Sequence, residues 1–192
     1  PDNTTHTTRV LFDRDGDYSF RITSRDLAGN EAQTYGPDQF VIDKTAPSLR
    51  VEYDNTDGQN GNYYNAPRTA VITIEEHNFE TSRFSLSGEA SYEGTALAYP
   101  SLSEWSSSGD THTAAIHFQA EGDYSFRVAY TDKAGNQASE YPEDTFVLDY
   151  TAPELAIEDL VNQSANAAAV RPVVSWSGIY LESPAEITLT GS

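Results

Sequence analysis

Residues 16–30 read GDYSFRITSRDLAGN, and residues 122–136 read GDYSFRVAYTDKAGN. The two stretches start 106 residues apart and match without a gap. Two further blocks recur at the same spacing: FVID at 40–43 as FVLD at 146–149, and TAP at 45–47 as TAP at 151–153. A shared spacing over this length indicates an internal repeat, which decides how the rest of the chain is interpreted.

The repeat divides the chain into three parts. Residues 1–47 are the C-terminal half of one repeat, 48–153 are a complete repeat, and 154–192 are the N-terminal half of the next. A weaker match at an offset of 103 residues places Arg68 on Arg171 and extends the repeat into the last part. The sequence therefore predicts tandem units of about 106 residues.

Apolar and polar residues alternate within the complete repeat. Tyr124, Phe126 and Val128 share one face of a predicted strand, and the residues between them are polar. This period is typical of antiparallel sheet with one buried side. Strands are expected at residues 49–53, 68–75, 83–87, 111–118, 124–130 and 145–149. So many short strands, separated by turn residues, predict an all-β, antiparallel β-sandwich.

The same alternation selects a core, and one long segment lies outside it. The expected core residues are Ile72, Ile74, Phe84, Leu86, Ile116, Phe118, Tyr124, Phe126, Val128, Phe146 and Leu148. Residues 89–109 form a variable connection that contains Tyr92, Tyr99 and Trp105. These aromatic residues are expected to cover the sheet edge, and the alternative is that they stack on sugars.

Two tyrosines stand at a position that is diagnostic in immunoglobulin folds. There, a tyrosine near the start of strand F closes a corner with its hydroxyl, two residues before a cysteine. Tyr18 and Tyr124 stand two residues before Phe20 and Phe126. This spacing predicts an immunoglobulin-like tyrosine corner in both copies, with phenylalanine in place of cysteine. The alternative is an ordinary inward-facing tyrosine.

Three motifs, G-D-Y-x-F, D-x-A-G-N and F-V-x-D-x-T-A-P, each occur twice in the chain. Together with the stretch from Asn60 to Ile74 and with His77-Asn78-Phe79, they resemble the bacterial Ig-like domains. These domains occur in long tandem arrays on surface proteins and secreted multidomain enzymes. The resemblance covers essentially the whole chain and implies an extracellular or cell-surface module, without naming a ligand.

The turn motifs have structural interpretations. In Asp132-Lys133-Ala134-Gly135-Asn136, the aspartate is expected to accept backbone N–H groups, and Gly135 supplies a positive φ. The alternative is a binding loop at one pole of the sandwich. Pro47 and Pro153 are expected to stiffen the links between units. Asp149 is expected to anchor the turn before its link, and the alternative is a Ca²⁺ ion bound there.

A second calcium alternative is the polar run 54–62, which includes Asp54 and Asp57. Calcium prefers clustered oxygen ligands, but the twelfth-position glutamate of an EF-hand is missing. The corresponding run, 159–163, lacks most of the oxygen-bearing side chains. We therefore expect no cofactor and little effect of calcium on the thermal midpoint, with Asp54, Asp57 and Asp149 as the candidate ligands otherwise.

Charge and composition limit the class of partner. The chain carries 30 Asp and Glu against 11 Lys and Arg, a formal net charge of −19. This charge repels nucleic acid and anionic membranes, and no stretch is long and apolar enough for a membrane helix. We expect neither a nucleic-acid partner nor membrane insertion. The absence of cysteine excludes disulfides and thiolate catalysis.

No grouping of residues predicts catalysis. The sequence contains no phosphate-binding loop and no HExxH motif. His6 and His112 recur at matching positions beside a predicted strand, which favours a packing or surface role. We expect that the protein is not an enzyme.

The leading functional hypothesis is a stalk or spacer that projects another domain away from the bacterial surface. Its partners are then neighbouring Ig-like repeats in the same chain or head-to-tail copies. The alternatives are an adhesin module that binds a glycan or a host protein, and an accessory domain of a secreted polysaccharide-degrading enzyme. The half-repeats 1–47 and 154–192 are expected either to complete one sandwich between successive molecules, as in a filament, or to be an excerpt of a longer array.

Overall fold

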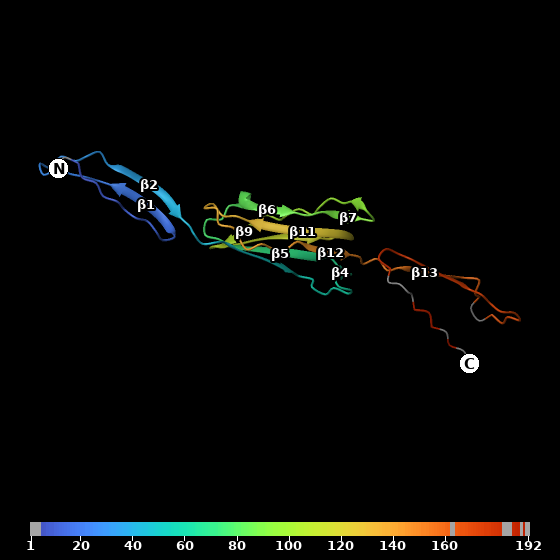
Figure 1. Ribbon diagram of the computed structural model, residues 1–192. Coiled ribbons are helices and arrows are strands. Elements are labelled where there is room, and N and C mark those ends of the chain that lie inside the picture. Colours follow the sequence, from blue (N-terminus) through green and yellow to red (C-terminus); the bar gives the residue numbers. More distant parts are fainter. Residues whose placement is uncertain (1–4, 162–163, 182–185, 189, 191–192) are drawn as a thin grey trace.

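The computed structural model describes residues 5–161, 164–181, 186–188 and 190. It shows three bodies in a row (Figure 1): an N-terminal hairpin, a central sandwich and a C-terminal hairpin. The hairpins contain β1 (Gly16–Ile22) with β2 (Tyr35–Ile42), and β13 (Glu154–Glu158) with β14 (Val173–Ser177). No helix in this described part is long and apolar enough to cross a membrane.

The central sandwich consists of two sheets. The first has the order β3-β5-β10-β9, and the second has the order β4-β12-β11-β7-β8, with β6 also paired to β11. The strands are β3 (Ser48–Tyr53), β4 (Tyr63–Tyr64), β5 (Arg68–Glu75), β6 (Phe84–Ser87), β7 (Ala90–Tyr92), β8 (Thr95–Ala96), β9 (Ser106–Ser108), β10 (Thr111–Phe118), β11 (Gly122–Tyr130) and β12 (Asp144–Leu148). A single 3₁₀ turn, Thr81–Arg83, precedes β6. The prediction of an all-β, immunoglobulin-like sandwich is confirmed.

The core lies between these two sheets. Ile72 and Ile116 of the first sheet and Phe126 of the second are fully buried. Phe126 contacts Phe118 edge-on, with ring centroids 5.9 Å apart. The inward-facing residues are buried as predicted, except for Phe84 and Leu86, which are half-buried. Those two residues lie on β6, which pairs only with β11 and therefore stands at an edge.

The variable connection folds onto the sandwich. Residues 89–109 contribute the β7–β8 hairpin and β9. Trp105 packs against Phe79 and Phe84, with centroid distances of 4.9 and 5.1 Å. The Tyr99 hydroxyl donates to the Ser125 carbonyl at 2.9 Å. Two of the three aromatic residues considered for sugar stacking are thus packed against the core.

The repeat predicts three strands in each end segment, counterparts of those in the complete repeat, and within the described residues each segment forms two. Residues 5–12 are irregular, although their counterpart β10 is a full strand. The physical reason is that β10 is held between β5 and β9, whereas no strand of the described part of the chain flanks residues 5–12. In the C-terminal segment, β13 and β14 form, and part of the expected third strand lies outside the described residues.

The C-terminal hairpin also corrects the weaker repeat alignment. In the sandwich, Leu49 pairs with Ile74. In the C-terminal hairpin, Leu155 pairs with Trp176. Leu155 stands 106 residues after Leu49, so this register places Trp176 on Ile74, at an offset of 102 residues rather than 103.

Candidate functional site

The tyrosine-corner geometry occurs at both predicted positions. The Tyr124 hydroxyl donates to the Ala120 carbonyl at 2.9 Å. The Tyr18 hydroxyl donates to the Arg14 carbonyl at 2.8 Å. Each bond spans four residues, and Tyr124 is only 5% exposed, with its ring stacked on Phe146. The corner therefore ties the start of β11, and that of β1, to the preceding chain.

The turn after β11 is organised by a buried carboxylate. Asp132 is fully buried. Its Oδ1 accepts the backbone N–H groups of Gly135 and Asn136 at 2.7 and 2.8 Å. Gly135 has a φ of +98°, which favours glycine. Asp26 receives the same backbone bond from Asn30 at 2.8 Å, and hydrogen bonds from Asn30 lower the pKa of Asp26.

The link that follows each unit is hydrogen-bonded to an acidic residue of that unit. The Thr151 hydroxyl donates to Glu121 at 3.0 Å. At the equivalent place 106 residues earlier, the Thr45 hydroxyl donates to Asp15 at 2.7 Å. This bond is the main cause that lowers the pKa of Asp15. Each link is thus hydrogen-bonded to an acidic residue that directly precedes a strand. Pro47, at the end of the first link, is buried.

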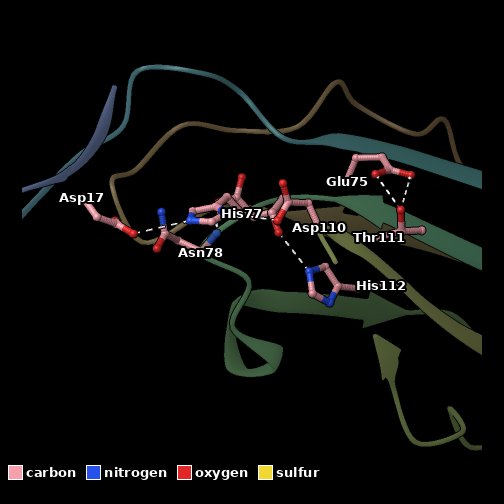
Figure 2. Close-up of polar contacts among 8 residues, drawn as sticks. Asp17, Glu75, His77, Asn78, Asp110, Thr111 and His112 are labelled. Atoms are coloured by element: carbon pink, nitrogen blue, oxygen red, sulfur yellow. Dashed lines mark hydrogen bonds and ion pairs between the residues drawn. The ribbon is translucent and has the colours of Figure 1, made fainter. Parts of the chain in front are cut away.

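A side chain of the central sandwich bridges the first junction, which is the contact region between the N-terminal hairpin and the central sandwich. The second junction is the corresponding region between the central sandwich and the C-terminal hairpin. His77, in the loop after β5, lies between two carboxylates (Figure 2). Its Nδ1 is 3.0 Å from Asp110, within the same sandwich, and its Nε2 is 3.5 Å from Asp17 of the N-terminal hairpin. These two acids raise the pKa of His77, Asp110 being the larger cause. Protonated His77 can therefore pair with both units at once.

The second junction has a corresponding contact. Asp123 stands 106 residues after Asp17, and it accepts a hydrogen bond from the Tyr180 hydroxyl at 2.7 Å. Tyr180 follows β14 and packs edge-on against Tyr63, with centroids 5.4 Å apart. Burial and the Asp123 carboxylate raise the pKa of Tyr180. The same carboxylate position thus receives a side chain from the following unit at both junctions.

Three carboxylates from both sides of the first junction lie together. Asp43, Glu76 and Asp132 each place an oxygen within 4.8 Å of the others. Glu76 is 7% exposed, and its burial, together with these two acids, raises its pKa. One Glu76 oxygen accepts the Asn78 N–H at 2.7 Å. Clustered carboxylate oxygens are ligands of the type that calcium takes.

The calcium candidates from the sequence do not form such a group. The Asp54 side chain accepts the Thr69 N–H at 2.7 Å, and Asp57 is exposed. Asp149 lies at the second junction. Within the described ranges, only Asp43, Glu76 and Asp132 form a set of this geometry. The sequence did contain a signal for Glu76, which continues the inward period of β5.

A buried cation, the Arg68 guanidinium, lies at the start of β5. Arg68 is 4% exposed. Its guanidinium is sandwiched between the rings of Tyr53 and Tyr64, 3.8 Å from each centroid. Its Nε donates to the Asn55 carbonyl at 2.9 Å. Cation–π contacts thus hold a charge that would otherwise be costly to bury.

The fold defines a class: an immunoglobulin-like β-sandwich, here flanked by a β-hairpin on each side. Residues 110–179 match the family model described as "Bacterial Ig-like domain (group 3)", so the resemblance carried by the motifs is confirmed. The match runs from β10 through β14 and does not coincide with the limits of the central sandwich. No curated protein and no solved structure matches the chain. Bacterial Ig-like domains are typically surface-associated modules.

Proposed function

We propose that the chain is a non-catalytic stalk or spacer of tandem units of about 106 residues in a bacterial extracellular or cell-surface protein. In this proposal the junctions hold successive units in a defined orientation. The observation that carries it is the recurrence of the junction contacts, because Asp17 and Asp123 each receive a side chain from the next unit. Ligand binding by one unit does not require this recurrence, whereas a stiff array does.

The clamped links support the same function. A linker of glycine and serine would let the units rotate freely. Here Thr45 and Thr151 are hydrogen-bonded to acidic residues at the base of the preceding unit. The links therefore have little freedom to change direction before the next strand begins.

The serine–histidine contact between Ser107 and His112 supports a non-catalytic role. Ser107 Oγ lies 2.7 Å from His112 Nδ1. However, His112 is 7% exposed, and its ring stacks on Phe79 with centroids 4.0 Å apart. Its Nε2 lies 2.9 Å from the Glu76 carbonyl oxygen. Both ring nitrogens are thus used to hold the loop after β5 against β9 and β10.

Electron paramagnetic resonance distances between pairs of spin labels test the proposal. The chain has no native cysteine, so two cysteines introduced into one chain can be labelled specifically. Gln39→Cys with Ser85→Cys spans the first junction, and Ser85→Cys with Ser175→Cys spans the second. We expect narrow distance distributions for both pairs, measured at low concentration in an excess of unlabelled chain.

The two junctions serve as controls for each other. Asp17→Ala should broaden only the distribution across the first junction, and Asp123→Ala only that across the second. Broad distributions in both unsubstituted pairs would show freely jointed units and would refute the spacer proposal.

A further inference from the structure

The chain lacks the side chains that oxidants usually attack first. It contains no cysteine and no methionine, but it has 12 tyrosines and 2 tryptophans. Sulfur side chains are the common targets of peroxides in proteins. In this chain a one-electron oxidant therefore acts on aromatic rings, and the structure decides which of these rings can react with one another.

Two of the tyrosines face each other across the second junction. Tyr63 of β4 and Tyr180, which follows β14, have ring centroids 5.4 Å apart, with 68° between the ring planes. Among the close ring pairs of the described residues, this is the one in which both members are tyrosines. Both side chains are half-buried. An oxidant can therefore act on them from the surface, while the surrounding residues keep the two rings together.

The backbone fixes the position of each ring. Tyr63 lies in a turn, where its N–H donates to the Asn60 carbonyl at 3.3 Å and its carbonyl accepts the Gln59 N–H at 2.8 Å. Tyr180 has a φ of +54°, a left-handed conformation that residues other than glycine seldom adopt. Such a conformation persists only where the surrounding contacts stabilise it. The two rings are thus held in place from both sides of the junction.

A carboxylate is positioned to receive a phenolic proton. The Tyr180 hydroxyl donates to Asp123 at 2.7 Å. Burial and the Asp123 carboxylate raise the pKa of Tyr180, so that its hydroxyl keeps its proton at neutral pH. A phenol that loses an electron becomes a strong acid, and a hydrogen-bonded carboxylate therefore makes the oxidation easier. Asp123 thus favours Tyr180 as the ring that is oxidised first.

We propose that Tyr63 and Tyr180 are an oxidative cross-linking site, which ties the central sandwich covalently to the next unit. The oxidant is a peroxide used by a haem peroxidase. Each tyrosine loses one electron and its phenolic proton, and the proton of Tyr180 passes to Asp123 and from there to solvent. The peroxide takes up both electrons and both protons and becomes water.

The two tyrosyl radicals then form one carbon–carbon bond between ring positions ortho to the hydroxyls. The hydrogen atom at each of these carbons moves to the phenolic oxygen, which restores both rings as a dityrosine. This inference rests on the proposed function, because a covalent tie at a junction serves a stalk whose units stay aligned.

Treatment of the dilute chain with hydrogen peroxide and a haem peroxidase tests the proposal. We expect a monomeric product with the fluorescence of dityrosine and an intact mass lower by two hydrogen atoms. This product should migrate faster on a denaturing gel, because a closed loop makes the unfolded chain more compact. Peptide mapping should join Tyr63 to Tyr180. Tyr180→Phe should abolish the product, whereas the matched Tyr64→Phe should leave it unchanged, because the Tyr64 ring stacks on Arg68.

Two comparisons separate the pairing of the rings from the acceptance of the proton. Asp123→Asn should slow formation of the product several-fold and leave the linked residues the same. Tyr35 also donates to a carboxylate, that of Asp38 at 2.5 Å, and it is 55% exposed. No close ring pair of the described residues joins Tyr35 to a second tyrosine, so it should give products only between chains at higher concentration.

A treated monomer without the link from Tyr63 to Tyr180, or one in which other tyrosine pairs are linked equally well, would overturn the proposal. Equal rates in the unsubstituted chain and in Asp123→Asn would overturn the role of Asp123. Narrow spin-label distances across the second junction in a chain that forms no such link would keep the spacer function and remove this site.

Discussion

Truncation of Phe126 is the strongest test of the sandwich, because this ring lies at its centre. The side chain is fully buried. It contacts Phe118, Tyr53 and Tyr141 edge-on, at centroid distances of 5.9 to 6.3 Å. These neighbours come from different strands and from the loop before β12, so they cannot all move in to fill the space. We expect Phe126→Ala to cost about 3–5 kcal/mol of unfolding free energy.

The matched control is Phe20, which stands 106 residues earlier in the same motif. Phe20 remains partly exposed, because no second sheet covers its hairpin among the described residues. Phe20→Ala should cost the central sandwich roughly nothing, because a separate core is affected. The two variants therefore compare the same sequence motif in a fully buried core and in a partly exposed hairpin.

The assay is urea denaturation followed by tryptophan fluorescence at low protein concentration, because Trp105 packs against Phe79 and Phe84 in the central sandwich. The slope of the transition should remain unchanged in the variants, so that a shift of the midpoint reports stability. A loss below about 1 kcal/mol for Phe126→Ala, or equal losses for the two variants, would refute the strand register.

Four further predictions concern the corner and the first junction. Tyr124→Phe should lose the corner hydrogen bond and cost about 0.5–1.5 kcal/mol in the same assay. In NMR titrations the pKa of His77 should lie above the ordinary 6.5 and should fall toward it in Asp17→Asn. Glu76→Gln should raise the thermal midpoint at neutral pH in EDTA, because burial disfavours the charged carboxylate. Calcium should change that midpoint little, and calorimetry showing a rise of about ten degrees would assign an ion to the three clustered carboxylates.

The calcium expectation follows from the register of the hairpins. At the second junction Asp149 corresponds to Asp43. The pairing of β13 with β14 places Gly178 where the first junction has Glu76. A three-carboxylate group therefore does not recur, and a metal site that served every junction would have to.

Sequence period alone predicted most of the sandwich. Strand β5 begins and ends at the predicted residues, and β10 does so as well. This succeeded because both strands alternate strictly and bury one side. However, the alternation of apolar and polar residues does not indicate which strands neighbour a given strand in the sheet. The edge position of β6 and the parallel pairing of β4 with β12 could not be obtained from it.

The junction contacts were beyond sequence reasoning for a different physical reason. A contact between units depends on the rotation of one unit about the link, which no local pattern encodes. Glu76 illustrates what the sequence could predict and what it could not. Its inward register was visible as the continuation of Ile72 and Ile74, whereas its approach to Asp43 of the preceding unit required the assembled junction.

The difference between the two junctions follows from the chemistry of the side chain that reaches the shared aspartate. The His77 contact gains strength from protonation. Since its folded-state pKa is raised, the contribution is fully present below the ordinary pKa and is lost as the pH rises through the raised one. Tyr180 donates as a neutral hydroxyl, and its raised pKa keeps the proton in place far above neutrality. Mild alkalinity should therefore broaden the spin-label distance across the first junction and leave the second unchanged, although both use the same position of the repeat.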